Sequence, residues 1–345
     1  MATGTAGWSI ETDGAEEPVL AVRDLSIRFD GLPDGLSLVD GLGFSVARGK
    51  TLCLVGESGC GKSLVSLAIM GLLASPPARI TSGSVKLEGE ELIGQPATKL
   101  MGLRGNRMAM IFQEPMTSLN PAFTIGDQLT EAVVRHNAIP AAQARERALD
   151  MLRKVRIPAP EARMNAYPHQ MSGGMRQRAM IAMALANSPR LLIADEPTTA
   201  LDVTIQAQIL KLIRDLQAQT GTAMILVTHD LGVVAEIADE VAVMYAGRIV
   251  ESGPVADIFA DPQHPYTLGL MGSLPSLGPR SGRLSAIPGA VPPPARWPQS
   301  CRFASRCPFV AEECRSARPP LRSIGNEHQV ACFRAPVEDL AGMAA

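Results

Sequence analysis

The chain has 345 residues, enough for two domains or for one large domain with an appendage. Its hydrophobic content of 46% is ordinary for a globular protein with a substantial core. The formal net charge of -2 excludes a globally polybasic nucleic-acid binder. No apolar run reaches the roughly 18 to 20 residues that span a bilayer, and the acidic N-terminus does not read as a secretory signal. We therefore expect a soluble, cytoplasmic protein, unless another chain holds it at a membrane.

Apolar patterning predicts the regular elements in chain order. Residues 1–17 are small and acidic and are expected to be disordered. Alternating or continuous apolar runs predict strands over 19–29, 51–55, 108–112, 190–194 and 223–227. Helical spacing predicts helices over 61–73, 203–217 and 231–237, with a mainly helical region over about 124–188. This alternation indicates a mostly parallel α/β sheet.

The composition changes after about Pro254, where the sequence becomes rich in proline. Such sequence is not expected to extend the sheet, so we place the start of a C-terminal appendage there. We find no internal repeat, which predicts one α/β unit per chain.

A glycine-rich segment between the predicted strand 51–55 and the following helix has the pattern G-x-x-x-x-G-K-S. Its residues are Gly56, Glu57, Ser58, Gly59, Cys60, Gly61, Lys62 and Ser63. Glycines let the backbone wrap closely, so that successive N–H groups at a helix N-terminus can cradle phosphate oxygens. Lys62 is suited to neutralise the β- and γ-phosphates, and the Ser63 hydroxyl to ligate Mg²⁺. The alternative is a glycine-rich turn without a ligand.

Two acids follow the apolar strand 190–194, at the end where ligands bind in open α/β sheets. Asp195 is suited to hold Mg²⁺ through water, and Glu196 to polarise the water that attacks a γ-phosphate. Two acids after a strand are common by chance, but the phosphate-loop pattern upstream favours the catalytic interpretation.

The segment Ser172-Gly173-Gly174-Met175-Arg176-Gln177, between these two motifs, resembles the signature sequence of ABC ATPases. The resemblance covers residues 18–252. It implies an α/β P-loop ATPase with a RecA-like core, an antiparallel β subdomain and a helical subdomain at about 114–188. In that family the signature, here Ser172, Gly173 and Gly174, closes over the ATP held by the opposite subunit of a head-to-tail dimer. A helix cap without further function is the alternative.

The same resemblance assigns four more residues. Gln113 resembles the lid glutamine that senses Mg²⁺ and the attacking water, so the implied Mg²⁺ contacts are Ser63, Gln113 and Asp195. Asp202, in Ala200-Leu201-Asp202, resembles the loop that crosses the dimer interface, and His229 the switch histidine that touches the γ-phosphate. Phe29 is the candidate to stack on adenine, with a core aromatic as the alternative.

Three longer strings resemble the oligopeptide/dipeptide/nickel importer ATPases: EPMTSLNP, YPHQMSGGMRQR and QHPYTLGL. The resemblance implies an ATP-hydrolysing subunit that powers import of peptides, or alternatively of nickel or another small solute. It also implies two permease subunits, a second related ATPase, an extracytoplasmic substrate-binding protein, and a place at the cytoplasmic face of the inner membrane. A soluble ABC-fold ATPase acting on nucleic acid or ribosomes is the alternative from another class, disfavoured because no long coiled coil precedes the signature. A non-catalytic regulatory subunit is disfavoured by the intact Glu196 and His229.

Four cysteines gather in the C-terminal region, which we place at 253–335, before a tail at 336–345. They are Cys301, Cys307, Cys314 and Cys332. In a reducing cytosol such clustering suggests metal rather than disulfides. The close C-x₂₋₄-C pairs of zinc modules are absent. The surrounding strings resemble the tail of the importer branch, where some members carry a [4Fe–4S] cluster. Zinc and four reduced structural cysteines remain alternatives.

Overall fold

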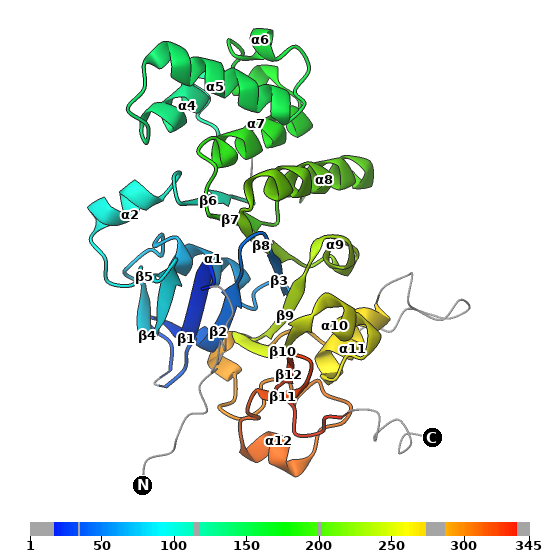
Figure 1. The fold of residues 1–345 in the computed structure, drawn as a ribbon. Coiled ribbons are helices and arrows are strands. Elements are labelled where there is room, and N and C mark those ends of the chain that lie inside the picture. Colours follow the sequence, from blue (N-terminus) through cyan, green and yellow to red (C-terminus); the bar gives the residue numbers. More distant parts are fainter. Residues whose placement is uncertain (1–16, 34, 114–117, 199–201, 274–286, 337–345) are drawn as a thin grey trace. The chain divides into compact units, whose positions relative to one another are not determined.

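The computed structural model describes residues 17–33, 35–113, 118–198, 202–273 and 287–336. The expectations for residues 1–16, 114–117, 200–201 and 337–345 lie outside this part. The chain forms two compact units (Figure 1). The first unit contains residues 1–45, 51–91 and 227–345, and the second contains residues 46–50 and 92–226.

The first unit contains a four-stranded antiparallel sheet in the order β2-β1-β4-β5. Its strands are β1 (Leu20–Phe29), β2 (Val39–Val46), β4 (Ala78–Leu87) and β5 (Glu90–Glu91). The predicted strand at 19–29 is therefore confirmed. The register of β1 on β4 shifts between Arg23 and Ser26. At this bulge Asp24 has φ +49° and Gly83 has φ +105°, and a Cβ on Gly83 would overlap the backbone of Leu25. The bulge therefore requires glycine.

A second run of strands in this unit has the order β11-β12-β10-β9-β3. Its members are β3 (Thr51–Val55), β9 (Glu240–Tyr245), β10 (Arg248–Pro254), β11 (Arg322–Gly325) and β12 (His328–Val330). Strand β3 is parallel to β9, whereas β9, β10, β12 and β11 are successively antiparallel. Every residue of β3 is buried, as its continuous apolar sequence predicts.

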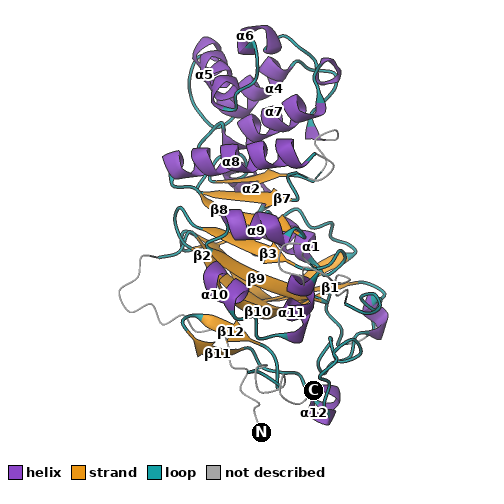
Figure 2. Cartoon of the chain, turned by 90° about the vertical axis from the view of Figure 1, so that its right-hand side faces the viewer, coloured by secondary structure: helices purple, strands orange, loops and turns teal. Residues whose placement is uncertain are grey.

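Six helices of the first unit lie in the described residues. They are α1 (Lys62–Ile69), α9 (Leu231–Ile237), α10 (Val255–Ala260), α11 (Pro265–Gly272), the 3₁₀ turn η2 (Pro294–Arg296) and α12 (Glu312–Ser316). Helices α9 and α10 lie against β3, β9 and β10 (Figure 2). Helix α1 ends at Ile69, earlier than the expected Leu73, because Gly71 adopts φ +62° directly after the cap.

The C-terminal residues return to the sheet, which the proline-rich sequence did not predict. The proline-rich stretch itself adds no strand among its described residues, but β12 pairs with β10 through Glu251 opposite Val330. The β11–β12 turn has positive φ at both Asn326 and Glu327, the geometry of a two-residue type I′ hairpin. The hairpin was not predicted because its sequence is polar and lacks the alternating apolar residues that usually indicate a strand.

The second unit contains the strands β8-β7-β6 in that order. They are β6 (Met108–Ile111), β7 (Leu191–Asp195) and β8 (Ala223–Thr228), which begins in this unit. Strands β6 and β7 are parallel, and all three were predicted within a residue of their observed ends. The helices are α2 (Ala97–Leu103), α4 (Ile125–Val134), α5 (Ala141–Lys154), α6 (Pro160–Arg163), the 3₁₀ turn η1 (Pro168–Gln170), α7 (Gly173–Leu185) and α8 (Val203–Thr220).

Helices α4, α5 and α7 pack on one another, which confirms the predicted helical region. Helix α5 shows why: its buried residues are Ala144, Ala148, Met151 and Leu152, spaced to form one apolar face. Among the described helices, none has both the length and the apolar character required to cross a bilayer.

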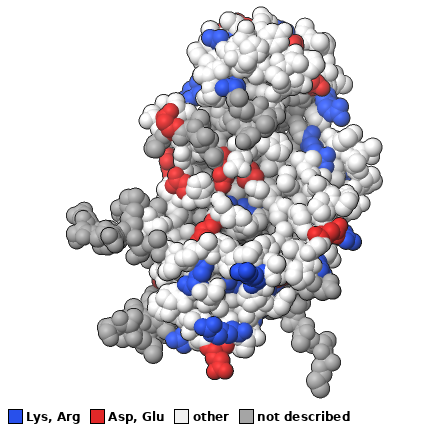
Figure 3. Space-filling model, turned by 180° about the vertical axis from the view of Figure 1, so that it is seen from behind, with Lys and Arg blue, Asp and Glu red and all other residues white. Residues whose placement is uncertain are grey.

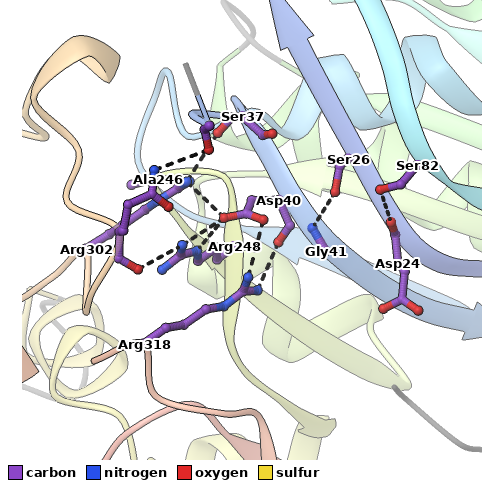
Figure 4. A network of polar contacts seen from close by, with 12 residues as sticks. Asp24, Ser26, Ser37, Asp40, Gly41, Ser82, Ala246, Arg248, Arg302 and Arg318 are labelled. Atoms are coloured by element: carbon purple, nitrogen blue, oxygen red, sulfur yellow. Dashed lines mark hydrogen bonds and ion pairs between the residues drawn. The ribbon is translucent and has the colours of Figure 1, made fainter. Parts of the chain in front are cut away.

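Three arginines surround one carboxylate where the C-terminal region meets the body of the first unit (Figure 4). Oδ2 of Asp40, on β2, accepts hydrogen bonds from Arg248 at 2.8 and 2.9 Å and from Arg302 at 3.0 Å. Arg318 donates to Oδ1 at 3.3 Å. Burial acts to raise the pKa of Asp40, but the guanidinium groups outweigh it and hold the pKa below its usual range. Asp40 therefore stays ionised and binds the C-terminal region electrostatically.

Candidate functional site: a phosphate loop and a catalytic acid

The glycine-rich motif connects β3 to α1 within the first unit, as predicted. A Cβ on Gly56 would overlap the carbonyl oxygen of Met244, so only glycine fits between the loop and β9. Gly61 caps α1 with φ +104°. A Cβ placed on Gly59 would meet no atom within 4 Å, which leaves one side of the loop open. A backbone loop that opens at a helix N-terminus is the geometry of a phosphate cradle.

Lys62 folds back onto its own loop. Its Nζ donates hydrogen bonds to the carbonyl oxygens of Gly56 at 2.7 Å and Glu57 at 3.2 Å. The neighbouring Cys60 is fully buried, and burial raises the pKa of its thiol, although Lys62 acts in the opposite direction. Cys60 is therefore a packing residue rather than a reactive thiolate. Ser58 and Ser63 are exposed on the loop and at the start of α1.

The predicted catalytic acid, Glu196, is hydrogen-bonded by a second side chain in the second unit. Asp195 ends β7 and is buried. Glu196 follows with φ +46°, a left-handed conformation that is uncommon outside glycine and often marks functional positions. Nε2 of Gln113 donates a hydrogen bond to Oε2 of Glu196 at 3.1 Å. Gln113 follows β6, the strand parallel to β7, so the sheet brings these two predicted residues together.

The signature segment forms the start of α7. The Ser172 hydroxyl caps this helix by accepting from the Met175 N–H at 3.3 Å. Gly173 and Gly174 form its first turn, and a Cβ on Gly173 would meet no atom within 4 Å. The buried Gln177 amide donates to the carbonyl of Pro197, just after Glu196. This contact, which the sequence did not predict, connects helix α7 to the segment that follows Glu196.

The remaining sequence candidates lie at the ends of elements. Asp202 caps α8, where its side chain accepts from the Ile205 N–H at 2.9 Å. In the first unit, His229 is exposed after β8, and Asp230 caps the following helix α9. Phe29 is half-buried at the end of β1, which does not separate an adenine contact from a core role.

The donor atoms expected for Mg²⁺ are all oxygens, from a hydroxyl, a carboxylate and an amide. Such hard ligands suit Mg²⁺, which binds few protein groups and keeps its phosphate and water ligands. Asp195 and Gln113 follow neighbouring parallel strands and leave the same end of the second unit's sheet. The chemistry of the donor set therefore fits the ion.

The four C-terminal cysteines line one pocket of about 10 Å³, enough for roughly one water molecule. Burial, together with the neighbouring cysteines, raises the pKa of Cys307 to about 12 and that of Cys332 to about 11. Within the described ranges, no three His, Cys, Asp or Glu side chains are placed to hold a metal ion. The expectation of a metal-binding C-terminal extension is therefore not supported.

Comparisons with known proteins identify the family. Residues 39–199 match the ABC transporter family, and residues 250–314 match the oligopeptide/dipeptide transporter C-terminal region. Over 317 residues the chain is 54% identical to a probable peptide ABC transporter ATP-binding protein of Sinorhizobium fredii, covering 92% of this chain and 95% of the relative. The chain belongs to the ABC transporter ATP-binding proteins. The oligopeptide transport ATP-binding protein AppD of Bacillus subtilis is 49% identical over 315 residues, 91% of this chain and 96% of AppD.

Solved ABC ATPases share the fold. CbiO1 of Clostridium perfringens, part of an ABC transporter complex, aligns with a TM-score of 0.61 at 27% identity, covering 71% of this chain and 92% of CbiO1. An ATP-binding cassette solved as a dimer with ADP and phosphate aligns with a TM-score of 0.60 at 24% identity, covering 68% of this chain and 98% of that cassette. The predicted ABC ATPase fold is thus confirmed, and the chain is an ATP-hydrolysing transporter subunit.

Two residues of the C-terminal region contact the phosphate loop of this ABC ATPase, and the sequence did not predict either contact. The Glu57 N–H donates to the Tyr266 hydroxyl oxygen at 2.8 Å. Arg306 donates to the Glu57 carboxylate at 2.9 Å. Tyr266 lies in the string QHPYTLGL, which resembles the importer branch. Nothing in this string predicts a contact with a residue more than 200 positions away in the chain.

Proposed function

We propose that this chain powers a membrane importer of di- and oligopeptides. The observation that carries the proposal is the extent of the likeness to peptide transporter ATPases: 95% of the Sinorhizobium relative is covered. The likeness also includes the C-terminal region, of which residues 250–314 match the oligopeptide/dipeptide transporter C-terminal region. Import of nickel or another small solute by the same architecture is the second candidate, which the test below separates.

In the proposed cycle, ATP is held by the phosphate loop, Gly56 to Ser63, of one subunit and by Ser172, Gly173 and Gly174 of its partner. Lys62 leaves the carbonyls of its own loop to neutralise the β- and γ-phosphates. Mg²⁺, held by Ser63, Gln113 and Asp195, supplies charge neutralisation on the phosphates.

The remaining residues act on the attacking water and on closure. Glu196 orients the water for in-line attack, and Gln113 keeps the carboxylate in place. His229 donates to the γ-phosphate and stabilises the charge that develops there. Asp202 contributes to the dimer interface, and Phe29 stacks on adenine.

We further propose that two permease subunits, a second related ATPase and an extracytoplasmic binding protein complete the transporter, with this chain at the cytoplasmic face of the inner membrane. Nucleic acid is not among the proposed partners. Binding to the nucleic-acid backbone favours a continuous basic track on the protein surface. On the face drawn in Figure 3, Lys and Arg are instead interspersed with Asp and Glu.

For the C-terminal region, we propose that residues 253–335 form a functional unit with the ATPase domain, 18–252, and that its four cysteines bind a [4Fe–4S] cluster. A cluster binds each thiolate at a different iron, so its ligands stand further apart than the ligands of a single zinc ion. The four thiols line one pocket, which is the observation that supports this proposal. Iron and acid-labile sulfide assays on anaerobically purified protein test this. About four of each per chain supports it, and protein without iron refutes it.

The function is tested with the complete transporter in liposomes or nanodiscs. ATPase activity is measured with binding protein loaded in turn with di- and oligopeptides, nickel chelates and sugars. Stimulation by peptides alone is expected, and stimulation by nickel chelates alone assigns the second candidate. If the chain hydrolyses ATP but no permease co-purifies with it, the importer proposal is wrong.

A further inference from the structure

We propose that Tyr266 and Arg306 are positioning residues for ATP binding: they fix Glu57 of the phosphate loop, so that the C-terminal region sets how tightly the loop holds ATP. The Glu57 N–H donates to the Tyr266 hydroxyl oxygen at 2.8 Å, and the Glu57 carboxylate accepts from the Arg306 guanidinium at 2.9 Å. Glu57 directly follows Gly56, the residue at which the chain leaves β3 and enters the loop. Fixing it therefore fixes the direction in which the loop starts.

Tyr266 is a rigid anchor rather than a mobile tether. Its side chain is fully buried, and its ring packs against Tyr245, with centroids 4.8 Å apart, and Phe303, at 5.5 Å. Its own N–H donates to Nδ1 of His264 at 3.0 Å, which fixes the start of α11. A buried ring with close neighbours has little rotamer freedom. The Tyr266 hydroxyl therefore holds the Glu57 N–H in one place.

Arg306 is equally constrained. Its side chain is 6% exposed, and its guanidinium also donates to the carbonyls of Pro288 at 2.9 Å and Gly289 at 3.1 Å. It lies 5.8 Å from the centre of the Tyr245 ring. Because these hydrogen bonds fix the position of its guanidinium, Arg306 holds the Glu57 carboxylate in one place. Charge-assisted hydrogen bonds of this kind are stronger than neutral ones.

The need for such an anchor follows from Lys62. The Lys62 ammonium donates to the carbonyls of Gly56 and Glu57, and these bonds must break when it moves to the phosphates. Without a second support, the start of the loop would lose its partner as ATP arrives. Tyr266 and Arg306 hold the other groups of Glu57, so the loop stays ordered when Lys62 leaves. Because ordering a loop on binding weakens affinity, preordering it strengthens affinity.

The test compares variants of the full-length chain in ATP binding and in hydrolysis. Tyr266→Phe removes one hydroxyl and leaves the ring packing. Arg306→Gln removes the positive charge that faces Glu57. Arg306→Lys keeps the positive charge but lacks the planar guanidinium that donates several hydrogen bonds at once. Arg318→Gln is the matched control, because Arg318 joins the C-terminal region to Asp40 without touching the phosphate loop. Binding of a non-hydrolysable ATP analogue is measured by calorimetry, together with KM for ATP, kcat and the melting temperature.

We expect Tyr266→Phe to raise Kd and KM about fivefold and Arg306→Gln about tenfold, with kcat within about twofold. Arg306→Lys should recover part of the loss, and Glu57→Gln combined with Arg306→Gln should add little to either alone. Arg318→Gln should lower the melting temperature without changing Kd. Unchanged Kd and KM in both Tyr266→Phe and Arg306→Gln would overturn the proposal and assign these contacts to stability alone. The binding measurement needs neither permease nor peptide, so its outcome is independent of the proposed cargo.

Discussion

Gln113 donates a hydrogen bond to the carboxylate of Glu196 across two parallel strands, 83 residues apart in sequence. The acid is therefore oriented by a neighbour before water is activated. Gln113→Ala removes this hydrogen bond, and we expect kcat for ATP hydrolysis to fall about tenfold. Gln143→Ala, an exposed glutamine on α5, is the control. An unchanged kcat would mean that Gln113 does not orient Glu196.

Glu196→Gln keeps the shape of the side chain and removes the carboxylate that we propose to polarise the attacking water. We expect hydrolysis to fall at least about a hundredfold while ATP binding is retained, and the variant to accumulate as an ATP-bound closed dimer. Steady-state ATPase assays and size-exclusion chromatography with ATP check both points. The control is Glu146→Gln, an exposed acid in the same unit. Near wild-type hydrolysis in Glu196→Gln would refute the assigned role.

Asp40→Asn tests the attachment of the C-terminal region. The substitution leaves Arg302, whose side chain is 2% exposed, and Arg248, 9% exposed, without the carboxylate that faces them. Unpaired buried charges are costly, so we expect the free energy of unfolding to fall by about 2 kcal/mol or more. Urea denaturation measures it. Asp30→Asn, which breaks the exposed pair with Arg79, should leave the midpoint almost unchanged; equal losses in the two variants would contradict the argument.

We expect the buried His264 to make the free energy of unfolding fall at acidic pH. Burial lowers its pKa from 6.5 to about 4, and the nearby Glu251 only partly opposes this. The folded state therefore holds neutral histidine where the unfolded chain binds a proton. Its contribution to stability is complete above about pH 6.5 and is lost as the pH falls towards 4, by up to about 3 kcal/mol.

His264→Asn supplies the comparison, because asparagine can still accept from the Tyr266 N–H but does not titrate. Glu251 and His328, which form a hydrogen-bonded pair beside it, are present in both proteins and cancel in the difference. Urea denaturation between pH 7 and 4.5 should give a steeper loss of stability for the wild type. Parallel profiles would show that the pKa of His264 is the same in the folded and the unfolded state, which would contradict the argument.

The sequence predicted where the candidate nucleotide-binding motifs lie in the fold, because each motif is local. The phosphate loop, the acids after β7 and the capping Ser172 each occupy a few consecutive residues, and β3, β7 and β8 are continuous apolar runs. Strands such as β4 and β11 were not predicted, because ARITSGSVKL and RSIG carry polar, exposed residues. For β4, the pairing partner β1 also lies far earlier in the chain. The contacts of Glu57 with Tyr266 and Arg306 join residues 209 and 249 positions apart, and no local pattern encodes such pairs.

The β11–β12 hairpin has a further consequence for how this ATPase can be shortened. It covers the free edge of β10 and leaves β11, four residues long and fully exposed, as the outermost strand. Short, exposed outer strands discourage pairing with other molecules. A chain cut before Arg322 would present β10, a longer and mostly buried strand, as an open template for self-association. Strands β11 and β12 thus protect β10 from pairing with other molecules. A shortened fragment of this ATPase needs these two strands, or charged substitutions along β10, to stay monodisperse.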